Sequence, residues 1–285
     1  MDDGFPTRAP HIKPIGFGRV TVAADRRLFA EGRRCARVTV ATERLWLLHP
    51  SPRATTATVA AVRGETFVPD RSLFRPSGSD ARHPQPADRG EVWVGGDKRK
   101  LASARWFRGE LRLALAGTVP PAGANVRCHL DVARREAIEE AHTAMHLVVS
   151  ALARARQAVF TDACAVQGGR HFALVLRRDT FAPKGVADAL LAANEAAARR
   201  LEVKIEHAAA GFARDVDEQP FADGVRTPGG DVLRVVRIGE ASALPCDGTL
   251  RTTTAGLGRI VLAAARPVAE GWVLQFRLDP RSRGA

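Results

Sequence analysis

The sequence predicts an α+β protein in which a β-rich, barrel-like part precedes an α+β part. Three observations predict this fold class. Short strands separated by turn-rich segments fill residues 43–130, as in small β-barrels and curled sheets. Good helix formers with one apolar face occupy residues 132–156. Strands and a second helix then alternate toward the C-terminus, which is typical of an α+β sandwich.

Length and composition agree with a folded protein of two modest domains. The chain has 285 residues, of which 45% are hydrophobic and 26% charged. These values lie near globular averages and exclude wholesale disorder, collagen and coiled coil. We expect an N-terminal extension over residues 1–41, a barrel-like domain over 42–131 and an α+β domain over 132–285.

The extension and the barrel-like part are predicted from period-two alternation. Residues 18–22 and 36–41 alternate and resemble a short hairpin placed before the main fold. A polar loop, too long for a tight hairpin, is expected at residues 76–89. The strands of the barrel-like part are expected at residues 45–48, 56–63, 91–94, 102–107, 110–115 and 126–130.

The second part begins with a long helix over residues 132–156. Its apolar positions include Ile138, Ala141, Met145, Val148 and Leu152, a spacing that buries one face. A second helix is predicted at residues 185–200. Strands are predicted at residues 171–176, 201–207 and 232–238, followed by a strand pair at 258–264 and 271–278.

The formal net charge is +12, from 43 basic and 31 acidic residues, and only five of the basic residues are Lys. Tyr is absent, and the heavy use of Arg, Ala and Gly is also what a biased nucleotide composition produces. Two interpretations therefore remain open: a generally basic protein, or an electrostatic footprint for a polyanion.

Apolar segments and cysteine spacing indicate the compartment in which the protein is expected. The longest nearly apolar stretch, residues 144–153, is too short to cross a bilayer, and the N-terminus lacks a basic segment followed by an apolar one. The four cysteines at 35, 128, 164 and 246 include no CxxC pair, which indicates neither a disulfide scaffold nor a zinc ribbon. We expect a cytoplasmic protein without a membrane anchor.

The most informative local motif is His142-Thr-Ala-Met-His146 inside the predicted helix. Histidines at i and i+4 project from one face, so both imidazoles can reach one cation. Thr143 stands where a metalloprotease HExxH motif has its glutamate, which argues against that class. Two histidines at the edge of a core remain the alternative interpretation.

A third ligand for such a cation is available at Cys246, in the turn-like segment Leu244-Pro-Cys-Asp-Gly-Thr249. A thiolate presented by a rigid turn is a good zinc ligand. An ordinary small buried residue is the alternative.

With these motifs in place, the sequence resembles the alanyl-tRNA editing family, which comprises the editing domain of alanyl-tRNA synthetases and its freestanding AlaX relatives. His142-Thr-Ala-Met-His146-Leu147 is very close to the family's HTATHL. The other similar segments occur in the family's order over roughly residues 42–280: Thr42–Trp46 with Pro50, Asp70–Pro76, Gln85–Gly90, the residues Gly123, Val126, Asp131 and Arg135, then residues 232–239, Cys246–Thr249 and Thr254–Gly258.

The resemblance implies a β-barrel followed by the editing domain shared with threonyl-tRNA synthetase, with a metal-bearing helix packed on an antiparallel sheet. It implies a deacylase that hydrolyses the ester of a mischarged tRNA, usually carrying serine or glycine, and that binds the tRNA acceptor end. The implied zinc ligands are His142, His146, Cys246 and a fourth histidine, but Leu250 stands at that fourth position. An acidic residue of the family is also replaced, by Leu244.

Two outcomes for the metal remain open. Two histidines and a cysteine still make a coherent catalytic zinc site, in which a zinc-bound water attacks the ester while backbone N–H groups near Gly248 hold the oxyanion. Alternatively, metal and reaction have been lost together. Replacement ligands are available in principle at His83, His129 and His171, and Asp247 is a further ligand or proton acceptor.

Recognition residues follow from the same motifs. We expect the Thr143 hydroxyl to lie at the pocket edge and distinguish polar from apolar side chains, unless it bonds back to the preceding turn. Gln85, in the role of the family's loop glutamine, would hydrogen-bond the terminal adenosine or the aminoacyl group. Basic clusters that could neutralise acceptor-stem phosphates lie at residues 98–100, 134–135, 177–178 and 199–200.

The leading hypothesis is a freestanding aminoacyl-tRNA deacylase with a zinc cofactor and no DNA or membrane partner. The alternative is a divergent, non-hydrolytic member that binds charged tRNA or transfers its aminoacyl group. A metal-free small-molecule binding protein is a third hypothesis, which makes less use of the charge of +12.

Overall fold

The computed structural model describes residues 40–77, 85–157, 159, 165–209, 232–269 and 271–279. All of these residues belong to one compact unit. The hairpin expected over residues 18–41 lies outside the described residues, apart from its last two positions. His83 and the middle of the expected polar loop also lie outside them.

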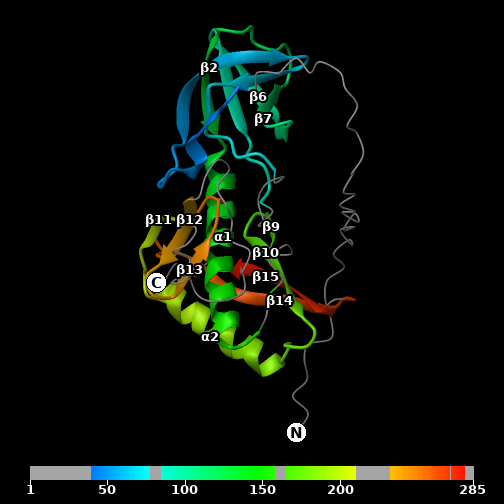
Figure 1. Cartoon of the computed structure of the whole chain (residues 1–285), viewed down its shortest axis with the longest axis vertical. Coiled ribbons are helices and arrows are strands. Elements are labelled where there is room, and N and C mark those ends of the chain that lie inside the picture. The colour runs from blue at the N-terminus through cyan, green and yellow to red at the C-terminus, as the bar shows by residue number, and fades with distance from the viewer. Residues whose placement is uncertain are drawn as a thin grey trace. The chain divides into compact units, whose positions relative to one another are not determined.

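A closed six-stranded barrel forms the first part of the described chain, as the short strands predict (Figure 1). Its strands follow the order β2-β3-β7-β6-β5-β8. Inward positions carry apolar side chains such as Phe67, Val92 and Leu113, each fully buried. The strand bounds are β2 Ala54–Arg63, β3 Thr66–Pro69, β5 Gly90–Val94, β6 Asp97–Phe107, β7 Glu110–Leu115 and β8 Asn125–Leu130.

The structure departs from the expected strands of this part at three places. Residues 45–48 are not a strand, because Leu45–Leu47 forms a 3-10 turn, η1, that buries Leu45 and Trp46 in the barrel's core cluster. The short β3 was not predicted, although it forms a hairpin with β2 through Gly64 at φ +62°. A two-residue parallel pair, β1 Glu43–Arg44 with β4 Arg71–Ser72, was also missed.

The long helix α1 spans Val132–Arg154 and ends two residues earlier than predicted. Asp131 caps it by accepting a hydrogen bond from the backbone N–H of Arg134 at 3.0 Å. Every residue from Ile138 to Leu152 is buried, rather than one face alone. The reason is that α1 contacts β9 and β10 of one sheet, β13 of another, and helix α2 (Figure 1).

Two antiparallel sheets and α2 complete the second part, in agreement with an α+β class. The orders are β14-β15-β10-β9 and β11-β12-β13. Strands β9 and β13 were not predicted. Neither α1 nor α2 has the length and apolar character needed to cross a bilayer. The bounds are β9 Ala165–Gly168, β10 His171–Arg177, α2 Pro183–Ala198, β11 Val203–Ala209, β12 Val232–Ile238, β13 Ser242–Pro245, β14 Arg259–Pro267 and β15 Gly271–Asp279.

Buried ion pairs join α1 to the barrel. The Arg135 guanidinium is fully buried and donates to both carboxylate oxygens of Asp88, to the Ser51 hydroxyl and to the Leu73 carbonyl. One turn later, Glu139 accepts two hydrogen bonds from Arg53, at 2.9 and 2.8 Å. Because a buried charge is tolerated only when it is paired and hydrogen-bonded, these contacts fix the segment around Asp88 against the helix.

Candidate metal centre

Three predicted ligands meet inside the second part of the described chain. His142, His146 and Cys246 are buried, and their ligand atoms lie within 4.8 Å of one another. The Cys246 Sγ and His142 Nε2 atoms are 3.3 Å apart. Two imidazoles and one thiol form a donor set that suits zinc, whose tetrahedral bonds place N and S ligands about 3.6 Å apart. The cluster can therefore hold a metal ion.

The secondary structure explains why these residues meet. His142 and His146 are one turn apart on α1, with ring centroids 5.2 Å apart. Cys246 directly follows β13, and its backbone N–H bonds to the Arg234 carbonyl of β12 at 3.1 Å. The buried Arg234 side chain donates in turn to the carbonyls of Cys246 and Gly248. Arg234 thus holds the turn that presents the thiol.

Gln85 is buried and bonds to both sides of this site. Its side-chain carbonyl lies 3.1 Å from His142 Nδ1 and accepts the backbone N–H of Thr249 at 3.3 Å. Its amide nitrogen donates to the Thr249 hydroxyl at 2.9 Å. An acceptor at Nδ1 selects the tautomer in which Nε2 is free to bind a metal, which is how supporting residues orient ligating histidines.

Gly248 is a position where only glycine fits. A Cβ atom there would lie 1.8 Å from Cε1 of His142. Its backbone N–H lies 3.2 Å from Cys246 Sγ and donates to it. The N–H expected near an oxyanion is therefore engaged with the sulfur, where it supports negative charge.

Thr143 is fully buried and its hydroxyl is used within the protein. It donates to the Glu139 carbonyl at 2.8 Å and accepts the Arg251 backbone N–H at 3.1 Å. The bond back to the preceding turn is the alternative that the sequence left open.

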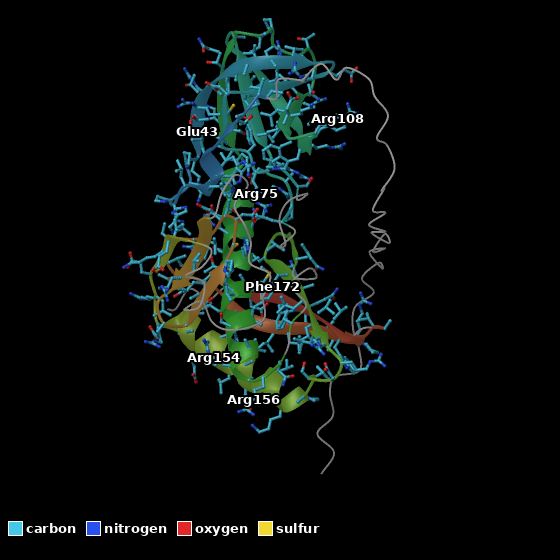
Figure 2. The ribbon with its side chains drawn as sticks, viewed as in Figure 1. Glu43, Arg75, Arg108, Arg154, Arg156 and Phe172 are labelled. Atoms are coloured by element: carbon cyan, nitrogen blue, oxygen red, sulfur yellow. The ribbon has the colours of Figure 1, made fainter. Side chains whose placement is uncertain are left out.

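Asp247 lies beside the cluster but is not part of it. Its carboxylate is 3.7 Å from the guanidinium of the buried Arg75, which is labelled in Figure 2. The Arg75 guanidinium also donates to the backbone carbonyl of Gln85. Neither His129 nor His171 joins the cluster among the residues that the structure describes.

Burial, together with a smaller effect of the adjacent Asp247, raises the pKa of the Cys246 thiol to about 12 in the metal-free chain, although Arg234 acts to lower it. The thiol is therefore neutral near pH 7. A metal ion would have to displace its proton, as is usual for cysteine ligands.

Comparison with known proteins gives this geometry a context. The chain is 32% identical over 197 residues to an alanine–tRNA ligase from Parafrankia sp.. The aligned region covers 66% of the chain and 21% of the ligase. It is 29% identical over 238 residues to the ligase of Methanothrix thermoacetophila, covering 81% of the chain and 25% of the ligase. Over most of its length, the chain is therefore similar to a segment of alanine–tRNA ligase. This confirms the relationship to the alanyl-tRNA editing family that the motifs indicate.

These alignments cover most of this chain but only a small part of each ligase. The chain spans about a fifth to a quarter of the ligases it matches, including that of Methanopyrus kandleri, which is 28% identical over 217 residues and of which 23% is covered. No family model matches the chain.

The two departures from the family motif lie in the hydrophobic core. Leu250 stands where the resemblance implies a fourth ligand, and it is only 4% exposed. Leu244 stands where an acid is expected and is 2% exposed. Both belong to the core cluster that includes Cys246. The two positions therefore contribute to core packing in this chain.

Sequence reasoning missed the two buried arginines that support the site. Arg234 is on a strand, where a basic residue is usually solvent-exposed, so no pattern marked it. Arg75 was included in the similar segment Asp70–Pro76 but was given no role. Only the tertiary structure shows that both hold the segments next to Cys246 and Gln85.

Proposed function

We propose that this chain is an aminoacyl-tRNA deacylase that hydrolyses the ester of a mischarged tRNA, with zinc held by His142, His146 and Cys246. The observation that carries the proposal is the convergence of these three buried side chains in a relative of alanine–tRNA ligase. The reaction adds water to the ester carbonyl, breaks the bond to the ribose oxygen and returns a proton to that oxygen. It releases a free amino acid and an intact tRNA.

The proposal gives each nearby residue a supporting task. When bound, zinc would supply a Lewis acid that assists ester hydrolysis. Gln85 orients His142 through Nδ1, and the Gly248 N–H supports the sulfur of Cys246. Thr143 fixes the backbone of Arg251. In this proposal Gln85 and Thr143 are positioning residues, because their polar atoms already bond to the protein.

A deacylation assay tests the proposal. The protein is incubated with tRNA charged with alanine, serine, glycine or threonine, and loss of the radiolabelled ester is followed. We expect ester loss from at least one mischarged species, and loss of that activity in a Cys246→Ala variant that retains its helical circular dichroism. An intact protein that cleaves no species in the panel would overturn the proposal.

A second function is favoured by one observation, the apolar packing of Leu250 and Leu244 at positions where the family has polar residues. A member with fewer polar groups at the site could bind charged tRNA without hydrolysing it, or pass the aminoacyl group to another acceptor. Transfer would appear as tRNA binding with no ester loss in water and with ester loss only when an amine acceptor is added. Ester loss in the absence of an acceptor contradicts this second function.

A further inference from the structure

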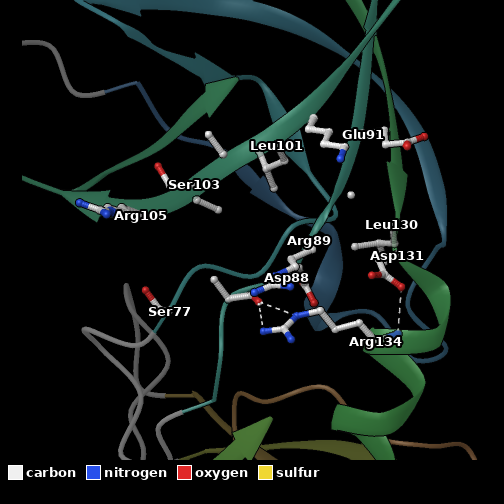
Figure 3. Close-up of a pocket in the computed structure, with 15 residues that line it drawn as sticks. Ser77, Asp88, Arg89, Glu91, Leu101, Ser103, Arg105, Leu130, Asp131 and Arg134 are labelled. Carbon is white, nitrogen blue, oxygen red and sulfur yellow. Dashed lines mark hydrogen bonds between the residues drawn. The ribbon is translucent and has the colours of Figure 1, made fainter. Parts of the chain in front are cut away.

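A groove of about 710 Å³ lies between the barrel and the start of α1, apart from the metal cluster (Figure 3). Arg105 and Ser103 of β6 border it on one side, and Arg134 of α1 borders it on the other. Four cationic side chains line it: Arg89, Lys100, Arg105 and Arg134. This density of positive charge in one hollow indicates a site for an anion.

Three of the cations are available to a ligand. Arg89, Lys100 and Arg105 are exposed, and within the described part of the chain none of them forms an ion pair. Arg134 is half-buried and donates only to the Ala87 carbonyl, at 3.3 and 3.4 Å. Among the described residues, no carboxylate therefore forms an ion pair with these cations.

The carboxylates of the groove are already engaged. Asp88 is buried against Arg135, with N–O distances of 2.9 and 2.5 Å. Glu91 pairs with Lys98 at 2.8 Å, outside the groove lining. Asp131 accepts the backbone N–H of Arg134 as the cap of α1. Among the described residues, a bound anion would thus face cations without an acidic partner and acids that already have hydrogen-bond partners.

Small residues also line the groove, among them Ala87, Gly90 and Ala102, and small side chains allow close approach of a bound chain. The pairing of β6 with β7 shifts register between Leu101 and Ser103, a bulge that bends the strand here. Ser103 adds a hydroxyl donor to the lining. Phosphate backbones are bound by such combinations of Arg, Lys and hydroxyl groups.

The groove leads to the metal cluster along two segments. Arg134 and His142 are eight residues apart on α1, which is about 12 Å at 1.5 Å per residue. The segment from Gln85 to Gly90 begins beside His142, and its residues from Ala87 onward line the groove. At the 3.4 Å spacing of stacked nucleotides in one strand, 12 Å is about three to four nucleotides.

We infer that this groove binds the sugar-phosphate backbone of a tRNA 3′ end, three to four nucleotides before the aminoacylated terminus. The inference rests on the proposed function, because it takes the cluster as the place where that terminus lies. The groove holds phosphates by charge and reads no bases, so binding is salt-dependent and indifferent to sequence.

The test uses two charge-matched double variants of the full chain. Lys100→Gln with Arg105→Gln removes two cations from the groove. Arg108→Gln with Arg127→Gln removes two exposed cations from the barrel outside it. Binding of uncharged tRNA is measured by filter retention over a range of salt concentrations, with full-length tRNA and with tRNA lacking its last four nucleotides.

For full-length tRNA, we expect the groove variant to bind about tenfold more weakly and its log–log salt slope to fall by about 1.4, since each phosphate contact to a single strand contributes about 0.7. The control variant should change affinity by less than about threefold, because its two cations do not line the groove that holds the phosphates. On truncated tRNA the two variants should bind alike. Equal binding of full-length tRNA by both variants would overturn the inference.

The assay separates this inference from the proposed function. If the parent deacylates tRNA while the two variants bind alike, the groove assignment fails and the deacylase stands. If the groove variant alone loses affinity while the parent cleaves no ester, the groove stands and the deacylase fails. A parent that binds no tRNA overturns both.

Discussion

Replacing Gln85 with leucine tests whether this residue positions His142. The change removes three contacts of the Gln85 side chain: those with the His142 ring, with the Thr249 N–H and with the Thr249 hydroxyl. A buried polar group that loses its hydrogen bond costs about 1–3 kcal/mol. The total is reduced because the Thr249 N–H contact is long, at 3.3 Å, and because the Thr249 hydroxyl can rotate to another partner. We therefore expect the free energy of unfolding to fall by about 2–4 kcal/mol. Loss of a residue that orients a ligating histidine lowers metal affinity about 10–100-fold.

Two measurements on the same variants check this prediction. Zinc affinity is measured by competition with a chromogenic chelator, and stability is measured by urea unfolding of the metal-free protein. Gln85→Glu is the matched control, because its carboxylate still accepts from His142 Nδ1 and from the Thr249 N–H. We expect the control to bind zinc within about threefold of the parent affinity, well inside the loss expected for leucine. A folded Gln85→Leu variant with parental zinc affinity would refute the positioning role.

Three further outcomes follow from the described contacts. Arg135→Met should lower the free energy of unfolding by about 3–5 kcal/mol, because Asp88 would be left as a buried unpaired charge, and a loss below about 1 kcal/mol in urea unfolding would contradict that. Leu250→Ala should lower the free energy of unfolding by about 2–4 kcal/mol, because the Leu250 side chain packs in the core. A loss below about 1 kcal/mol in the same measurement would contradict that packing role. Since the pKa of Cys246 is about 12 without metal, zinc binding at pH 7 should release about one proton per chain, and zinc affinity should fall as the pH falls. Calorimetry in buffers of different ionisation enthalpy measures this proton release. Its absence would show that the thiol is not a ligand.

The sequence predicts much of the fold because the periodicity signals are strong. The β2, β5, β7 and β8 strands and both helices occur within a few residues of their expected places. The failures have local reasons. Leu45–Leu47 is apolar enough for a strand but turns to bury Trp46. The four-residue strands β9 and β13 are too short to show alternation.

In the candidate site, local sequence patterns likewise identify some residues but not the long-range contacts between them. His142 and His146 are found by helical spacing alone, and Cys246 by its turn-like surroundings. The hydrogen bonds of Gln85, by contrast, cross 57 residues to His142 and 164 residues to Thr249, and no local pattern encodes such contacts. The requirement for glycine at 248 likewise arises only because α1 places the His142 ring against that turn.

The zinc content of the purified protein tests the central claim most directly. Native mass spectrometry of the parent chain should show one zinc ion per chain, and the ion should be absent from Cys246→Ala and His146→Ala variants that keep the circular dichroism of the parent. Arg127→Gln, which changes an exposed residue of the barrel, should retain it. A parent chain that takes up no zinc, or a folded Cys246→Ala variant that binds it as tightly as the parent, would contradict the account.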